Sequence, residues 1–287
     1  METPRILNLI NYLPVFLTIS MTWFFSSILI STDIRPERPI VTPLEEPEPT
    51  APPAEALSSP APYLNTLIFI MVLTVSGIVL LYFARKKPKF FKILVTFFIW
   101  IISFGVTALY TLIATLFLQL YSSYLLLASS LAVATLVTYS IVRGGELKAS
   151  TASAYIASGA GAVIGISIPY WTFLILIIGI SIYDIIAVFK GHLSSITKMD
   201  APALKGLVVE IGDIALGLGD LFFYSLTISA IYLNHGIISA IASTISIIVG
   251  YMIVLYALSK RRQLPGLPIP LLLTLTSTFI LSILSRQ

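Results

Sequence analysis

The chain has 287 residues, of which 57% are apolar and 10% charged, and its mean hydropathy is +0.98. This composition excludes an ordinary soluble protein, because runs of the roughly 20 apolar residues that a helical membrane span requires recur along the chain. The chain has no cysteine, which excludes disulfides and thiolate chemistry. Its two histidines, His192 and His235, do not form an H-E-x-x-H zinc motif. We therefore expect neither a metal nor a cofactor, and no nucleic-acid partner.

Nine apolar segments in chain order predict an all-α polytopic membrane protein with one membrane domain over residues 1–287. The expected spans are 6–30, 63–84, 91–118, 121–142, 149–168, 171–189, 207–233, 236–258 and 264–284. The first is too long for the apolar core of a signal peptide, so we expect it to be retained. The connector between the third and fourth spans is short, so eight or ten spans remain alternatives.

The basic residues predict the orientation of these spans. With the N-terminus in the cytoplasm, 14 of the 17 Lys and Arg residues lie on the cytoplasmic side, as the positive-inside rule requires. The densest group is the cluster at 85–92. We expect a multi-pass protein of the cell membrane with its N-terminus inside and its C-terminus outside.

The segment 31–62 interrupts this apolar pattern with nine prolines and six acidic residues. Such a segment buries too little apolar surface to fold alone, so an extended, mobile external loop is expected. A passive tether is the simplest expectation for such a loop. The segment precedes a helical bundle over 63–168 and a functional part over 169–287.

Small residues recur every fourth position in the fifth span, at Ala157, Gly161 and Gly165, with Gly159 beside them. This spacing lets the backbones of membrane helices approach closely. It predicts a packing face.

Two carboxylates lie inside apolar spans, where a charge is costly and usually functional. Asp184 lies in the sixth span, six residues before Lys190, or about 9 Å inside its cytoplasmic end. Asp220 lies in the seventh, about 15 Å deep when counted along a helix from Glu210. Because consecutive spans are antiparallel, the two side chains are expected to face each other.

Four residues at intervals of three and four, Glu210, Asp213, Gly217 and Asp220, would form one polar stripe along a helix. Such a stripe predicts access of water to Asp220 from the cytoplasm. Two carboxyls that share a site do not both ionise cheaply. One can then activate water while the other donates a proton to a carbonyl oxygen, without metal or cofactor.

Helix-weakening residues flank these acids. Gly217 and Gly219 precede Asp220, and each costs a helix up to about 1 kcal/mol relative to alanine. Freed backbone at membrane depth is tolerated only where it is buried or lines a cavity. Three prolines and a glycine within 264–270 likewise oppose a regular helix. We expect either a kinked helix start there or an extended element that closes the site.

Together these segments resemble the presenilin family of intramembrane aspartyl proteases, also called GxGD proteases. The resemblance is carried by Tyr183-Asp184, by Gly217-Leu218-Gly219-Asp220 with the following Phe-Tyr-Ser, and by Leu264-Pro265-Gly266-Leu267-Pro268. It implies that Asp184 and Asp220 are catalytic. It also implies that Tyr183, Gly217, Leu218, Gly219, Pro265, Gly266 and Leu267 position the substrate.

In its small size the chain resembles the prokaryotic or archaeal members of the family. This implies that transmembrane helices of other proteins are its substrates and that accessory subunits are not required. The corresponding loop in the family also suggests, as the alternative to a passive tether, that segment 31–62 screens substrates. One departure is Gly266, where the family has alanine.

Several other classes share part of the pattern. The signal peptide peptidase branch has the same acids in an inverted orientation, which the basic residues disfavour. Prepilin-type peptidases usually carry a basic residue soon after the G-x-G-D acid, which this chain lacks, and a rhomboid-type serine nucleophile motif is absent. An ion channel or proton-coupled transporter that uses the paired aspartates remains the alternative from a different class.

Overall fold

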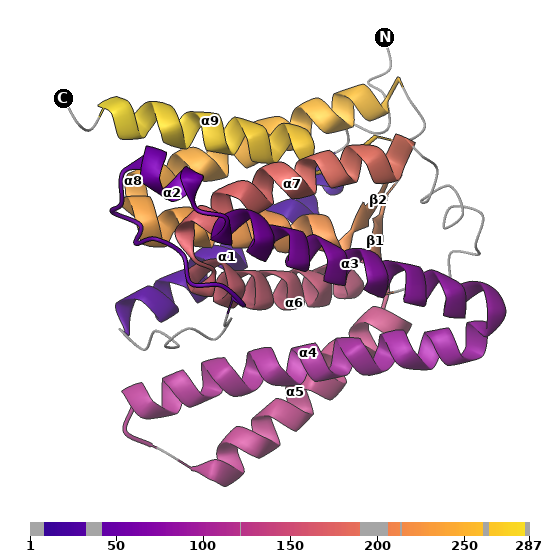
Figure 1. The fold of residues 1–287 in the computed structure, drawn as a ribbon. Coiled ribbons are helices and arrows are strands. Elements are labelled where there is room, and N and C mark those ends of the chain that lie inside the picture. The colour runs from indigo at the N-terminus through magenta and orange to yellow at the C-terminus, as the bar shows by residue number, and fades with distance from the viewer. Residues whose placement is uncertain are drawn as a thin grey trace.

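The computed structural model describes residues 9–32, 42–120, 122–189, 206–212, 214–260 and 264–284 (Figure 1). Within these ranges the chain is largely helical, with one strand pair. The elements are η2 Leu9–Tyr12, α1 Leu13–Ser31, α2 Pro53–Ser58, α3 Ala61–Lys86, α4 Pro88–Phe117, α5 Ser123–Arg143, α6 Glu146–Ser167, α7 Tyr170–Phe189, β1 Val208–Ile211, β2 Ile214–Gly217, α8 Leu218–Leu258 and α9 Pro268–Leu284.

Seven helices of the described part are long and apolar enough to cross a membrane. They are α1 together with η2, and α3 to α8, whereas α9 has 17 residues. The expectation of a helical polytopic membrane protein is confirmed at this level. On α3, large apolar side chains such as Met71 and Val75 are exposed, as lipid-facing positions should be.

Helix α8 is two helices that meet at Gly236, whose φ of 76° and ψ of −177° are not helical. Ser229, before this break, shares a hydrogen bond with Ser26 of α1, while Thr244, after it, accepts one from Trp23 of α1. In a straight helix Ser229 and Thr244 would lie about 22 Å apart, yet both contact the same turn of α1. The chain therefore reverses at Gly236, and the expected break between the seventh and eighth spans is confirmed.

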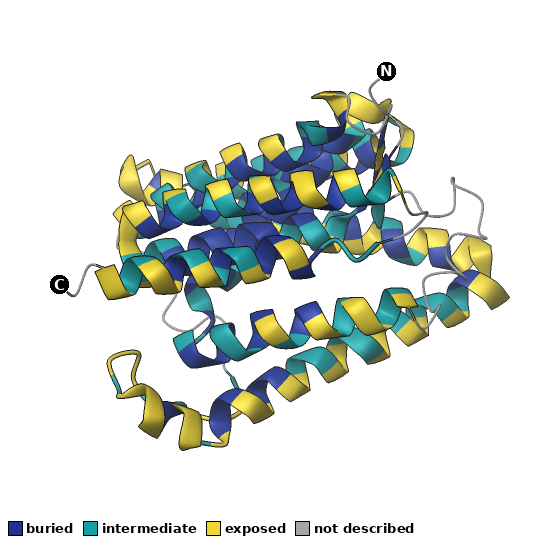
Figure 2. Cartoon of the chain, turned by 90° about the horizontal axis from the view of Figure 1, so that it is seen from above, coloured by how far each residue is buried: buried dark blue, intermediate teal, exposed yellow. Residues whose placement is uncertain are grey.

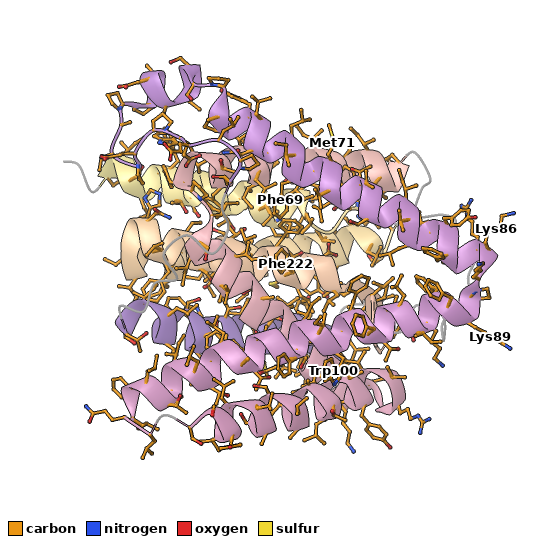
Figure 3. All side chains as sticks on the ribbon, turned by 60° about the horizontal axis from the view of Figure 1, so that its bottom comes forward. Phe69, Met71, Lys86, Lys89, Trp100 and Phe222 are labelled. Carbon is orange, nitrogen blue, oxygen red and sulfur yellow. The ribbon has the colours of Figure 1, made fainter. Side chains whose placement is uncertain are left out.

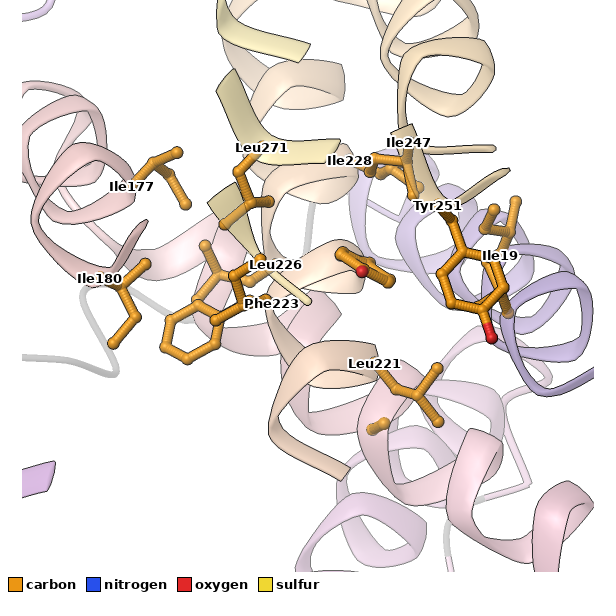
Figure 4. Packing of buried hydrophobic residues seen from close by; sticks show 14 of the residues in the cluster. Ile19, Ile177, Ile180, Leu221, Phe223, Leu226, Ile228, Ile247, Tyr251 and Leu271 are labelled. Atoms are coloured by element: carbon orange, nitrogen blue, oxygen red, sulfur yellow. The ribbon is translucent and has the colours of Figure 1, made fainter. Parts of the chain in front are cut away.

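The main core lies where α7, α8, α9 and α1 meet. Figure 4 shows part of this cluster, to which α1 contributes Ile19, α7 contributes Ile177, the two halves of α8 contribute Leu221 and Tyr251, and α9 contributes Leu271. Buried positions follow the central helices, while α4 and α5 carry many exposed residues (Figure 2). The core thus surrounds the beginning of α8, where Asp220 lies.

The small residues of α6 let this helix approach the first half of α8. A Cβ on Gly161 would lie 2.7 Å from the Ser225 Cβ and 2.8 Å from the carbonyl oxygen of Phe222. A Cβ on Gly165 would collide with the carbonyl oxygen of Leu226. The predicted packing face is confirmed, and glycine is required at these two positions because the facing atoms are largely backbone.

Hydroxyl groups join the central helices through side-chain hydrogen bonds. The pairs are Ser26 with Ser229, Trp23 with Thr244, Ser225 with the carbonyl oxygen of Ser158, Ser243 with Thr278, and Ser246 with Ser277. They link α1, α6 and α9 to α8. Small polar residues at helix interfaces in a bilayer supply this kind of contact.

The described part of the proline-rich segment 31–62 is fastened to α7 and α3. The Glu46 carboxylate accepts hydrogen bonds from the backbone N–H of Trp171 and of Thr172, each at 2.9 Å, and from the Thr172 hydroxyl at 2.7 Å. Asn65 of α3 bonds both the N–H and the carbonyl oxygen of Leu44. The expectation of a freely mobile loop is wrong for this part, because Glu46 satisfies backbone donors at the start of α7 that would otherwise lack partners. A role in substrate screening stays a prediction.

A strand pair precedes α8, in place of the helix expected from residue 207. Strands β1 and β2 pair antiparallel, with Glu210 opposite Ala215, and Gly212 turns between them with a φ of +57°. The Gly212 N–H donates to the Glu146 carboxylate at 3.1 Å. The expected start of the seventh span is therefore wrong, as is the polar stripe along one helix, because Glu210 and Gly217 lie in strands. Asp213 lies outside the described residues.

Candidate active site

Asp184 and Asp220 come from two neighbouring helices. Asp184 lies in the last two turns of α7, whereas Asp220 is the third residue of α8. A carboxylate in the first turn of a helix is favoured by the helix dipole and by unpaired N–H groups. The hairpin that ends at Gly217 delivers Asp220 to this position, so the depth once counted along a helix from Glu210 does not apply.

The structure brings the two carboxylates together. They are close enough to interact electrostatically, and both side chains are partly buried. The segment 264–267 lies beside both of them. The Leu267 N–H donates to Asp184 Oδ2 at 3.0 Å, and a Cβ on Gly266 would lie 2.6 Å from Asp220 Oδ2.

Segment 264–267 is non-helical between α8 and α9, as its prolines require. Leu267 is buried in the main core, while Pro265 and Gly266 are partly buried. α9 starts at Pro268, a tolerated position because the first helical N–H has no partner within the helix. The segment beside the site is thus non-helical and α9 begins after it; that the segment closes the site stays a prediction.

The glycines around Asp220 differ in what surrounds them. A Cβ on Gly217 would make an ordinary contact at 3.5 Å with Asp220 Oδ2, whereas one on Gly219 would meet no atom within 4 Å. Gly219 is also exposed, so a side chain would have room at this position.

The remaining predicted residues lie around the site without a described contact to a carboxylate. Tyr183 and Leu218 are partly buried and pack against the main core. The Leu218 N–H donates to the carbonyl oxygen of Leu207 and so extends the strand pairing to the first residue of α8. In the described ranges no group of three or more His, Cys, Asp or Glu side chains could hold a metal ion.

Sequence reasoning missed one residue of the site. Tyr224 was noted only as part of the Phe-Tyr-Ser that follows Asp220, but its hydroxyl donates to the carbonyl oxygen of Gly266 at 2.8 Å. Its spacing of four residues from Asp220 places both on the same face of α8. That spacing was the available signal.

Comparisons with known proteins identify the family to which the chain belongs. A family model described as "Signal-peptide peptidase, presenilin aspartyl protease" matches residues 40–203. Presenilin-B of Dictyostelium discoideum is 36% identical over 118 residues, which cover 37% of this chain and 24% of that protein. The matched region thus amounts to about a quarter of that relative's length.

Two solved structures of a presenilin family intramembrane aspartate protease, in space groups C222 and P2, each superpose with a TM-score of 0.66. Their identities to this chain are 19% and 18%; the matches cover 96% and 97% of this chain and 99% and 98% of theirs. This likeness shows a shared fold. With more than half of the chain matched by the family model, the chain belongs to the signal-peptide peptidase and presenilin family of aspartyl proteases, which are hydrolases.

Proposed function

We propose that this protein hydrolyses peptide bonds within the transmembrane helices of other membrane proteins, with Asp184 and Asp220 as the catalytic pair. The observation that carries the proposal is the meeting of these two carboxylates, from α7 and α8, beside the non-helical segment 264–267. Two acids in this arrangement can supply the general base and the general acid that an aspartyl protease requires.

The mechanism needs one ionised and one protonated carboxyl. The ionised carboxyl takes a proton from a water molecule as that water attacks the scissile carbonyl carbon. The protonated carboxyl donates to the carbonyl oxygen, which gives a tetrahedral intermediate. Breakdown of the intermediate cleaves the C–N bond as the nitrogen receives a proton, and two new chain ends result.

A substrate helix must unwind before its peptide bonds can be attacked, and the strand pair offers a place for the unwound chain. In a two-stranded sheet each strand has one unpaired edge, and β2 leads directly to Asp220. An extended peptide can add to such an edge through backbone hydrogen bonds. We therefore expect Gly217, Leu218 and Gly219 to lie along the bound substrate, with Pro265, Gly266 and Leu267 on its other side.

The test is cleavage of a single-span reporter by the purified protein in lipid. Asp184→Asn and Asp220→Asn keep the side-chain size, and each should abolish cleavage without lowering the thermal midpoint. Glu210→Gln, an exposed carboxylate on β1, is the control and should cleave like the wild type. Full activity in either aspartate variant would refute the two-acid mechanism.

The same assay tests two further parts of the proposal. We propose that accessory subunits are not required, so the purified chain alone is expected to cleave the reporter. Reporters with a glycine in the span should be cut faster than poly-leucine spans, because they unwind more easily; equal rates would contradict this preference. Ion flux through proteoliposomes without cleavage would instead support a channel or transporter, which family membership does not favour.

We also propose nine spans with a cytoplasmic N-terminus, counting α8 as two and extending α9 by segment 264–267. The turn between α3 and α4, where Lys86 and Lys89 project (Figure 3), would then lie in the cytoplasm. Because the chain has no cysteine, single cysteines at Lys87 and Glu55 can be labelled with a membrane-impermeant thiol reagent in sealed vesicles. Labelling of both from the same side would refute this topology.

A further inference from the structure

Tyr224 holds the backbone of segment 264–267 against α8. Its side chain is fully buried, and its hydroxyl donates to the carbonyl oxygen of Gly266 at 2.8 Å. We propose that Tyr224 is a positioning residue for the aspartate pair: it orients the peptide unit that contacts both Asp184 and Asp220. This inference rests on the proposed function, and it assigns no direct chemical step to Tyr224.

The Gly266–Leu267 peptide unit is the connecting element. Its carbonyl oxygen accepts the bond from Tyr224, and its N–H donates to Asp184 Oδ2 at 3.0 Å. A peptide unit is planar, with its C=O and N–H pointing in opposite directions. Fixing the oxygen therefore fixes the direction of the N–H, so the Tyr224 hydroxyl determines whether the N–H points at Asp184.

The same unit also sets the distance to Asp220. A Cβ on Gly266 would lie 2.6 Å from Asp220 Oδ2 and 3.1 Å from its Cγ, so the hydrogen of glycine allows a backbone approach that alanine would prevent without a shift. Asp220 and Tyr224 belong to successive turns of α8. The helix that presents Asp220 thus also anchors the peptide unit that rests on Asp220, and Asp184 is tied to the far side of that unit.

A second buried tyrosine provides a matched control. Tyr251, in the second half of α8, belongs to the same core, and its hydroxyl donates to a backbone carbonyl oxygen, that of Asn11, at 3.0 Å. Both tyrosines also lie close enough to Asp220 to interact with it electrostatically. They differ in that Tyr224 bonds the peptide unit between the aspartates and also lies close enough to Asp184 to interact with it.

The experiment compares Tyr224→Phe with Tyr251→Phe in the purified protein in lipid. Each variant loses one buried hydroxyl and keeps its ring, so similar decreases in thermal midpoint are expected. Tyr224→Phe should lower kcat about tenfold with KM changed by less than about twofold, because the missing bond aligns groups that act in the transition state. Tyr251→Phe should leave kcat within about twofold of the wild type.

A readout independent of cleavage is amide hydrogen exchange of the peptide that contains Gly266 and Leu267. Tyr224→Phe should speed exchange of the Leu267 N–H about tenfold, and Tyr251→Phe should not. Unchanged exchange in Tyr224→Phe, or equal effects of both variants on kcat, would overturn the inference. Since exchange needs no substrate, this result is separate from the aspartate variants, whose full activity would refute the proposed function.

A double variant tests whether Tyr224 and Gly266 act on one element. In Tyr224→Phe the peptide unit is no longer held against Asp220, so adding Gly266→Ala should lower kcat less than it does in the wild type. Independent, multiplicative losses would show that the two residues act separately and would also contradict the inference.

Discussion

Glu46 permits the sharpest test of how the proline-rich loop before α3 is attached to α7. Its carboxylate accepts two backbone N–H groups and one hydroxyl at the start of α7, while the Trp171 indole donates to the Glu48 carbonyl oxygen at 3.0 Å. Glu46→Ala removes three bonds and leaves two helix N–H groups without this acceptor. Loss of a capping side chain costs about 1 kcal/mol, and hydrogen bonds to charged groups are worth about 1.5–3 kcal/mol. Because the site is only partly buried, we expect about 2 kcal/mol in total.

This free energy should appear as release of the loop. A cost of about 2 kcal/mol raises the population of the detached loop about 30-fold. A broad-specificity protease should cut residues 42–60 faster by that factor, provided that opening and closing are rapid compared with cleavage. Glu46→Gln, which keeps one carbonyl acceptor, should give an intermediate rate. The exposed neighbour supplies the control Glu45→Ala. Cutting of Glu46→Ala within about twofold of that control would refute the capping role.

Further predictions concern glycines, each checked by the thermal midpoint in detergent. Gly236→Ala should destabilise the protein by about 1–3 kcal/mol, because its φ of 76° and ψ of −177° are adopted almost only by glycine. Gly105→Ala in α4, whose Cβ would meet no atom within 4 Å, should be neutral or stabilising by up to about 1 kcal/mol. Equal midpoints for the Gly236→Ala and Gly105→Ala variants would contradict this contrast. Gly165→Ala should lower both the midpoint and the cleavage rate, because it forces α6 away from the Leu226 carbonyl of α8. An unchanged rate would show that this contact does not support the site.

The helices were predictable because each apolar segment is long enough to span a bilayer and carries charges only near its ends. The reversal at Gly236 was predictable for the same reason, since a straight helix as long as the 41 residues of α8 is about twice as long as a bilayer core requires. The strand pair at 208–217 was not predicted. Its β-branched residues around Gly212 were a signal for a hairpin, but in an apolar context a helix is expected, because strand edges are costly in lipid. Here the strands pair with each other, and β1 packs on α6.

The candidate site was predictable from those residues whose type is unusual inside an apolar segment. Asp184 and Asp220 could be singled out because a carboxylate inside an apolar span is costly and therefore usually functional. The prolines of 264–270 predict a break in the helix. The contacts that hold the site together did not stand out. The Glu46 cap joins segments 125 residues apart. The hydrogen bond from Tyr224 ends on a backbone oxygen of Gly266, and because every residue has such an oxygen, the sequence does not indicate this partner. The assigned roles of Tyr183, Leu218 and Pro265 stay predictions.

Assembly of the protein in the bilayer depends on how its helices are joined. Serine and threonine let each helix enter the lipid alone, and a hydroxyl bond between membrane helices contributes only about 0.6 kcal/mol on average. No single bond is then decisive, and the bundle tolerates the loss of one. The two aspartates behave differently, because each is expensive in lipid until it meets the other segments of the site. A chain that has inserted its helices but not packed them has no aligned pair of acids, so under the proposed mechanism it could not cleave a substrate until the bundle is complete.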